Sequence, residues 1–292
     1  MSGGKQLFNV MDVSCMQAKL SPNFQSSTNS PGQLSASCTN GLKGCIGTRG
    51  TSNSAALASR FCAEFLKNLR KSQGLDIPPE YESVAIKAML VHCCSWGDVG
   101  KVLHDKFVPQ IPRLRKKEVL KWIGYGYPNP EISSFCTDQR VTLVGYGELP
   151  NGMQSEFNFP LPSCLISKAV SKRLTITLAW LSPIASCNQD YRLAKLSFRT
   201  KSSLIAKDIS DSDERAAKRG TVQHEVFVGK QASTYLSGTN LEIVVSCKKE
   251  DRLTYPVKYV LMATLEVSPE VSLPIYEEIK SSLAQQVEPL KV

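Results

Sequence analysis

The chain has 292 residues, of which 42% are hydrophobic and 21% charged, and its formal net charge at pH 7 is +9. This length suits about two domains, and the apolar content is enough to build their cores. No run of about 18 apolar residues and no apolar N-terminal stretch occurs, which excludes a transmembrane helix and a secretory signal and predicts a cytoplasmic protein.

The ten cysteines are spread irregularly along the chain, and no Cys-x-x-Cys pair occurs among them. Structural zinc sites draw their cysteines from such short spacings. The sequence therefore predicts no metal site and no cofactor, and reduced, mostly buried thiols are expected in a reducing compartment.

Residues 1–50 are the least regular part of the chain, and the Ser, Asn, Gly and Pro content of 21–32 predicts a loop. A helical pattern begins at Gly50-Thr51-Ser52. Its apolar residues recur at a spacing of three and four, at Ala55, Ala58, Cys62, Phe65, Leu66 and Leu69. In isolation Ser52 is typical of a helix N-cap. A second interpretation is a nucleophile, because the N–H groups of a first helical turn stabilise negative charge.

A second helix is predicted to start at Pro78-Pro79-Glu80 and to continue through His92, before Trp96-Gly97 ends it. Its apolar residues again follow a helical period. Both helices are expected to be core elements of an α/β layer.

Three segments in this order resemble the subtilisin-like serine proteases, the subtilase family. Residues 50–55, Gly-Thr-Ser-Asn-Ser-Ala, are similar to the segment that carries the family's nucleophile, with Ala56 where the family usually has proline. Residues 84–92 resemble the next helix, and Gly124-Tyr-Gly-Tyr-Pro-Asn-Pro130 is similar to the Gly-x-Gly segment that closes the catalytic domain. The resemblance implies that residues 1–137 are the C-terminal part of the α/β catalytic domain of an intracellular-type member, with Ser52 as nucleophile.

The other members of a catalytic triad do not precede Ser52. In the family the order is Asp, His, Ser, whereas His92, His104 and His224 all follow Ser52 here. We expect His92 to lie in the core or at a helix end, and His224 to be structural within a strand. Asp105 follows His104 directly, so the two side chains do not face each other on a helix. The chain alone is therefore expected to be nearly inactive, with Asp and His supplied by the missing N-terminal half of the domain.

The densest basic stretch is Arg113–Lys121, which also contains apolar residues. A solvated amphipathic face explains it better than a nucleic-acid site, because neither a recognition motif nor an aromatic stacking platform accompanies it. The expected partners are a protein or peptide substrate and the missing half of the catalytic domain, with no nucleic acid and no membrane.

From about Gln139 the pattern changes from helical to alternating. Six strands bounded by turn residues are predicted at 141–147, 174–180, 194–198, 221–228, 241–245 and 257–267, with a charged loop at 207–219. Residues 138–270 are therefore predicted to form an all-β sandwich or jelly roll. Sandwiches of this kind are appended to subtilases, so the resemblance implies an accessory domain. Residues 271–292 are predicted to form a C-terminal helix and tail, with the helix over Leu273–Leu283.

Two functions follow from these observations. The first is a serine-type endopeptidase that forms an acyl-enzyme on Ser52. The alternative is a catalytically inactive protease remnant that acts as a binding or interaction module.

Overall fold

The computed structural model describes residues 8–12, 19–22, 33–36, 44–48, 50–71, 77–106, 119–130, 136–185, 191–200, 220–230, 232, 235–268 and 270–287. The chain divides into two compact units, residues 1–64 and residues 65–292. The loops predicted over 21–32 and 207–219 and the basic stretch at 113–121 lie wholly or mostly outside the described residues.

The first unit contains two short antiparallel pairs, β1 with β2 and β3 with β4. Their bounds are Phe8–Asp12, Lys19–Pro22, Gln33–Ala36 and Cys45–Thr48. Helix α1 (Thr51–Lys71) follows β4 and begins at the predicted position; its residues up to 64 belong to the first unit, and those from Phe65 onward belong to the second. Phe65 and Leu69 are its buried residues, whereas Ala55, expected on the same buried face, is exposed.

The second unit begins with helices and a two-stranded pair. Helix α2 (Pro79–His92) starts at the predicted prolines, which suit a first helical turn because that turn leaves its N–H groups unpaired. After α2 come the elements β5 (Cys94–Ser95), α3 (Gly97–Lys106) and β6 (Tyr127–Pro128), and β5 pairs with β6.

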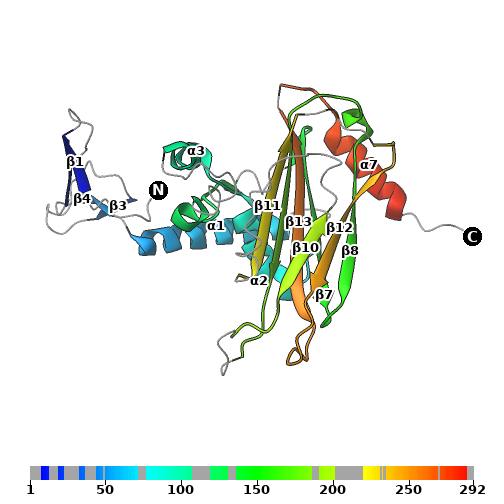
Figure 1. Cartoon of the computed structure of the whole chain (residues 1–292), viewed down its shortest axis with the longest axis horizontal. Helices are drawn as coiled ribbons and strands as arrows, with labels where there is room; N and C mark the ends of the chain where they lie inside the picture. Colours follow the sequence, from blue (N-terminus) through cyan, green and yellow to red (C-terminus); the bar gives the residue numbers. More distant parts are fainter. Residues whose placement is uncertain are drawn as a thin grey trace, which may run out of the picture. The chain divides into compact units, whose positions relative to one another are not determined.

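The rest of the second unit is a β-sandwich (Figure 1). Its strands are β7 (Arg140–Leu149), β8 (Gln154–Pro160), β9 (Lys172–Trp180), β10 (Leu196–Thr200), β11 (Val222–Gly229), β12 (Asn240–Cys247) and β13 (Val257–Val267). One sheet has the order β11-β9-β13-β7 and the other β10-β12-β8, with antiparallel pairing throughout. Successive strands therefore alternate between the two sheets.

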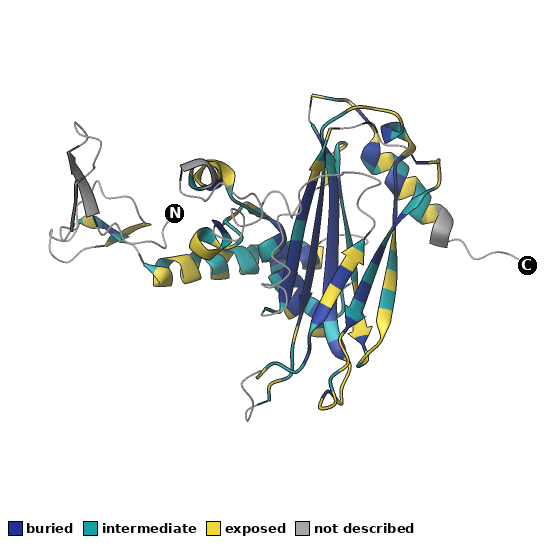
Figure 2. Ribbon diagram, viewed as in Figure 1, coloured by how far each residue is buried: buried dark blue, intermediate teal, exposed yellow. Residues whose placement is uncertain are grey.

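The hydrophobic core lies between these sheets. Inward residues of both sheets form one cluster, which includes Ile176, Trp180, Leu241, Ile243 and Leu265. Along β12 buried and partly exposed residues alternate, whereas β9 and β13 are buried along almost their whole length (Figure 2). A strand that is buried on both faces needs a second layer over its outer face.

Helix α2 supplies that second layer, since it packs on β9, β11 and β13. Helix α7 (Ile275–Val287) packs against β7 and β8 and is drawn in red in Figure 1. The α/β part of the predicted fold is not confirmed. In the described part of residues 1–137 the strands pair only in two-stranded antiparallel ladders, and α2 lies on the sandwich rather than on a parallel sheet.

The six predicted strands and the C-terminal helix are all present, so the β-rich part of the prediction is confirmed. The sequence prediction missed β8. Its segment Gln-Ser-Glu-Phe-Asn-Phe-Pro contains only two large apolar residues, but Phe157 and Phe159 are two apart and both turn toward the core. That two-residue alternation agrees with a strand, but two residues are too few to establish a period in the sequence.

Candidate functional site

Ser52 lies in the first turn of α1 and is exposed. The backbone carbonyl of Gly50 accepts hydrogen bonds from the N–H groups of Asn53 (3.2 Å) and Ser54 (3.3 Å), so Gly50 occupies the N-cap position and Ser52 stands inside the helix. Gly50 has φ +152°, a backbone conformation that side chains disfavour. The turn therefore presents the Ser52 hydroxyl beside the N–H end of the helix.

Asn53 holds this turn in place within the first unit. Its amide donates to the hydroxyl of Thr48 at 2.9 Å and to the Thr48 carbonyl at 3.2 Å. It also donates to the side-chain carbonyl of Gln33 at 3.3 Å, which ties the start of α1 to the β3–β4 hairpin. The nucleophile role of Ser52 stays a prediction.

Two histidines, His92 at the end of α2 and His224 in β11, are buried where α2 packs on the outer face of the four-stranded sheet. The Nδ1 atom of His92 lies 2.8 Å from the hydroxyl of Thr177, and its Nε2 atom lies 2.6 Å from that of Thr264. The Thr177 hydroxyl also lies 2.7 Å from Nδ1 of His224. The hydrogen-bonded chain continues from Thr264 to the Thr142 hydroxyl at 2.7 Å. These five residues form the His–Thr network, which joins α2 to all four strands of the sheet.

Burial in the His–Thr network holds both imidazoles in the neutral form. Burial, the neighbouring His224 and Arg173 lower the pKa of His92 to about 3. Burial and Arg173 lower the pKa of His224 to about 4. The expected structural positions of His92 and His224 are confirmed, because both are buried and hydrogen-bonded to threonine. His104 lies in α3.

Lys87 makes a second polar connection between α2 and the sandwich. Its ammonium donates to the Trp180 carbonyl at 3.0 Å and to the Thr221 hydroxyl. Burial lowers the pKa of Lys87, and Arg192 lowers it further. The helix is therefore attached at its middle by Lys87 and at its C-terminal end by His92.

The Gly-x-Gly segment packs beside the end of α2. Gly126 has φ +100°, and a Cβ atom there would overlap the backbone of Ser95, so only glycine fits the β5–β6 pairing. The Trp96 indole donates to the Gly124 carbonyl at 2.9 Å, and the N–H of Asn129 donates to the Cys93 carbonyl at 2.9 Å. The segment is therefore hydrogen-bonded to the residues that directly follow α2.

Three loops meet at one end of the sandwich, the lower end in Figure 1. The strand register brings them together, because Leu149 is paired with Val257, Trp180 with Tyr259, and Leu196 with Cys247. We call this surface the loop end. It consists of the described residues of the loops 150–153, 181–195 and 248–256.

Hydrogen bonds between these loops make the loop end a preorganised surface. The Asn151 amide donates to the carbonyls of Glu250 (2.7 Å) and Leu253 (3.1 Å) and accepts from the Glu250 N–H at 2.9 Å. The Lys248 N–H donates to the Lys195 carbonyl at 2.9 Å. Large apolar side chains are nevertheless exposed there, namely Met153, Leu181, Ile184, Tyr191 and Tyr255.

Sequence reasoning did not identify the loop end or the threonines of the His–Thr network. A signal for the threonines was present, because Thr175 and Thr177 alternate with apolar residues in β9 and so share one face of the strand. The loop end had no such signal, since its residues are scattered over three loops.

Within the described ranges, no three side chains of His, Cys, Asp or Glu gather closely enough to hold a metal ion. Among the helices of the described part of the chain, none combines the length and apolar character that a membrane span requires.

No protein-family model and no curated protein matches the chain. Among solved structures, it is similar to a chain of the cyanophage Pam1 capsid asymmetric unit, with 14% identity and a TM-score of 0.25, covering 45% of this chain and 87% of that one. It is also similar to a chain of the acid-stable capsid of Helicobacter pylori bacteriophage KHP30, with 13% identity and a TM-score of 0.19, covering 44% and 94%. At these values neither likeness assigns a family.

Proposed function

We propose that this chain is a non-catalytic structural protein that associates with copies of itself through the loop end. The observation that carries this proposal is that hydrogen-bonded loops hold large apolar side chains in the solvent. Tyr255 is 74% exposed and Ile184 is 70% exposed. Exposed apolar groups on a preorganised surface favour association, because little conformational freedom is lost when they are covered.

The charges of the loop end suit a second copy as the partner. The β12–β13 loop carries both signs within Lys248-Lys249-Glu250-Asp251-Arg252. In a two-fold contact the same patch occurs on both sides, so a patch with both signs can pair with itself. Aromatic and apolar residues between such charges are typical of the centre of an interface.

The fold agrees with a structural role by analogy only. We infer that the sandwich is a jelly roll, because strands β7 to β13 alternate between two sheets with the orders β11-β9-β13-β7 and β10-β12-β8. Double-sheet jelly rolls occur in self-assembling shells as well as in lectins and enzymes, so the proposal is carried by the loop end and not by the fold.

Replacing Tyr255 or Ile184 with aspartate is expected to weaken self-association about tenfold or more, because each change buries a charge in the contact. The dissociation constant can be measured by sedimentation velocity over a range of concentrations. Leu236→Asp is the matched control, since Leu236 is 81% exposed in the β11–β12 loop at the opposite end of the sandwich. A wild-type protein that remains monomeric at high concentration, or equal weakening by the control, would overturn the proposal.

The second candidate is the serine endopeptidase, which is supported by the exposed position of Ser52 in the first turn of α1. In this candidate Ser52 attacks a peptide carbonyl, and the base and its carboxylate come from the missing N-terminal half of the catalytic domain.

This candidate predicts that the purified chain does not react with a fluorophosphonate probe and that a form completed with the missing half is labelled at Ser52. Labelling is read by gel fluorescence and located by mass spectrometry. Ser54→Ala, an exposed serine of the same turn, is the control for Ser52→Ala. Equal labelling of the completed wild type and its Ser52→Ala variant would exclude the nucleophile role.

A further inference from the structure

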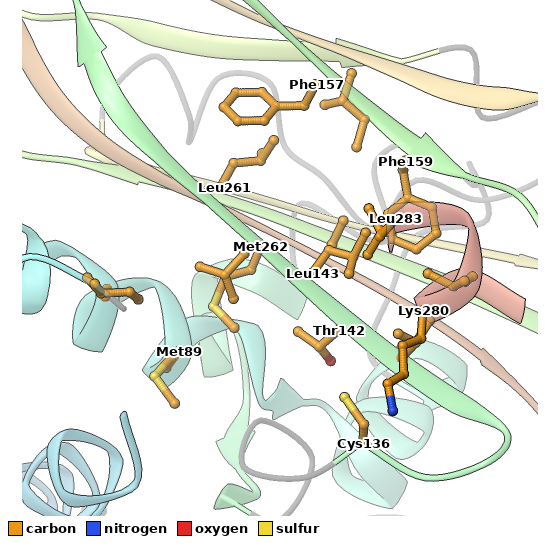
Figure 3. Close-up of a pocket in the computed structure, with 18 of the residues that line it drawn as sticks. Met89, Cys136, Thr142, Leu143, Phe157, Phe159, Leu261, Met262, Lys280 and Leu283 are labelled. Carbon is orange, nitrogen blue, oxygen red and sulfur yellow. The ribbon is translucent and has the colours of Figure 1, made fainter. Parts of the chain in front are cut away.

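A cavity of about 560 Å³ lies within the second unit, beside strand β7 (Figure 3). Its lining comes from β7, β8, β12 and β13 together with α1, α2 and α7. Small-molecule sites in proteins have volumes of roughly 300–1,000 Å³, so the cavity has the size of a ligand site.

Most of the cavity lining is apolar. Phe157, Leu261 and Leu143 face it from the sandwich, Met89 faces it from α2, and Leu283 faces it from α7. Gly145 has no side chain, and this leaves room for the Phe157 ring. A Cβ atom on residue 145 would overlap that ring. Such a lining favours an aliphatic chain, because each methylene removed from water contributes to binding.

One cation stands at the edge of this apolar space. Lys280 is the only charged side chain among the described residues that line the cavity. Its ammonium lies 5.6 Å from the centre of the Tyr276 ring, which also lines the cavity. In the view of Figure 3, Lys280 and Thr142 are on one side of the cavity and Phe157 is on the other. The cavity therefore has a cationic edge and an apolar interior.

We propose that this cavity binds a long-chain fatty acid, with the carboxylate at Lys280 and the hydrocarbon chain among Leu143, Phe157 and Leu261. A carboxylate complements the single cation, and the aliphatic chain complements the rest of the lining. The site is separate from the loop end, so it stands whether or not the chain self-associates.

The test is a fluorescence titration of the full chain with cis-parinaric acid, followed by displacement with palmitate or with hexadecanol. Saturable binding of one fatty acid per chain is expected. Lys280→Glu should weaken the binding of palmitate by about tenfold while changing that of hexadecanol by less than about twofold, because only the acid carries a charge. Leu283→Phe should weaken both ligands, because it fills the cavity from a partly exposed position on α7.

Lys230→Glu is the matched charge control, since Lys230 is exposed and follows β11, the strand at the opposite edge of the four-stranded sheet from β7. It should leave palmitate binding unchanged, and circular dichroism should confirm that all variants are folded. Absence of saturable binding by the wild type would overturn the proposal. It would also be overturned if Lys280→Glu and wild type bound palmitate equally, or if Leu283→Phe had no effect on either ligand.

Discussion

Lowering the pH from 7.5 to 5 is expected to reduce the free energy of unfolding by about 4 kcal/mol through His92 and His224 alone. The pKa of His92 in the folded chain is about 3 and that of His224 is about 4, both below the ordinary value of 6.5. As the pH falls below 6.5, the unfolded chain takes up protons at both imidazoles while the folded chain does not. Acid therefore favours unfolding, and this contribution to stability is fully present only above pH 6.5.

The expected loss comes from the environment of the His–Thr network. The side chains that face His92 are hydroxyls of β9 and β13, and the neighbouring groups His224 and Arg173 both disfavour a second positive charge. The Tyr125 ring packs edge-on against His224, with the ring centres 5.6 Å apart. Protonation of either histidine would place a charge under α2 without a compensating anion.

Urea unfolding of the full chain at a series of pH values measures this effect, with the free energy extrapolated to zero urea. In the double variant His92→Gln, His224→Gln, the free energy of unfolding should change less between pH 7 and pH 5 than in the wild type. Glutamine keeps polar groups at these positions but does not titrate. A double variant as acid-sensitive as the wild type would contradict the assignment.

Gly126→Ala is expected to destabilise the chain by about 3 kcal/mol or more, because both the backbone conformation and the available space disfavour a side chain. Gly126 has φ +100°, and its added Cβ atom would overlap the Ser95 carbonyl. That carbonyl belongs to the β5–β6 pair and cannot move away as a flexible side chain could. Separation of β5 from β6 would also weaken the hydrogen bond from the Asn129 N–H to the Cys93 carbonyl at the end of α2.

Gly124→Ala is the matched control for Gly126→Ala. Gly124 also has a positive φ, +56°, but an added Cβ atom would meet nothing within 4 Å. Gly124→Ala should lower the free energy of unfolding by only about 1 kcal/mol, which is the conformational strain of a left-handed residue. Thermal or urea unfolding would compare the two variants, and equal costs would show that the contact with Ser95 is unimportant.

The strands of the sandwich could be predicted because their side-chain alternation is local. The segment 257–267 was predicted with the bounds that β13 has in the structure. Strand β8 was missed because Phe157 and Phe159 are too few to establish a period, and its place in the sheet depends on pairing with the distant β12. Local pattern identifies a strand, whereas its partner strand is a matter of long-range packing.

For the helices too, local pattern predicted the element, whereas its packing partner depends on long-range contacts. Pro79 and Gly50 marked the starts of α2 and α1 correctly, because the first turn of a helix has local requirements. The layer on which α2 packs was expected to be a parallel sheet, and the structure places α2 on the antiparallel sheet of the sandwich instead. An apolar helix face indicates burial but does not identify the surface that buries it.

The sequence by itself determined the positions of α1, α2, α7 and six of the seven sandwich strands, the structural positions of His92 and His224, and the glycine turn that leads into a helix at Ser52. Only the tertiary structure decided what these elements form together. The His–Thr network, the loop end and the fatty-acid cavity each combine residues from distant segments, and Thr177 and Thr264 meet His92 only because three separate elements pack against one another. Periodicity acts within a turn or a strand, whereas a site depends on which elements come into contact.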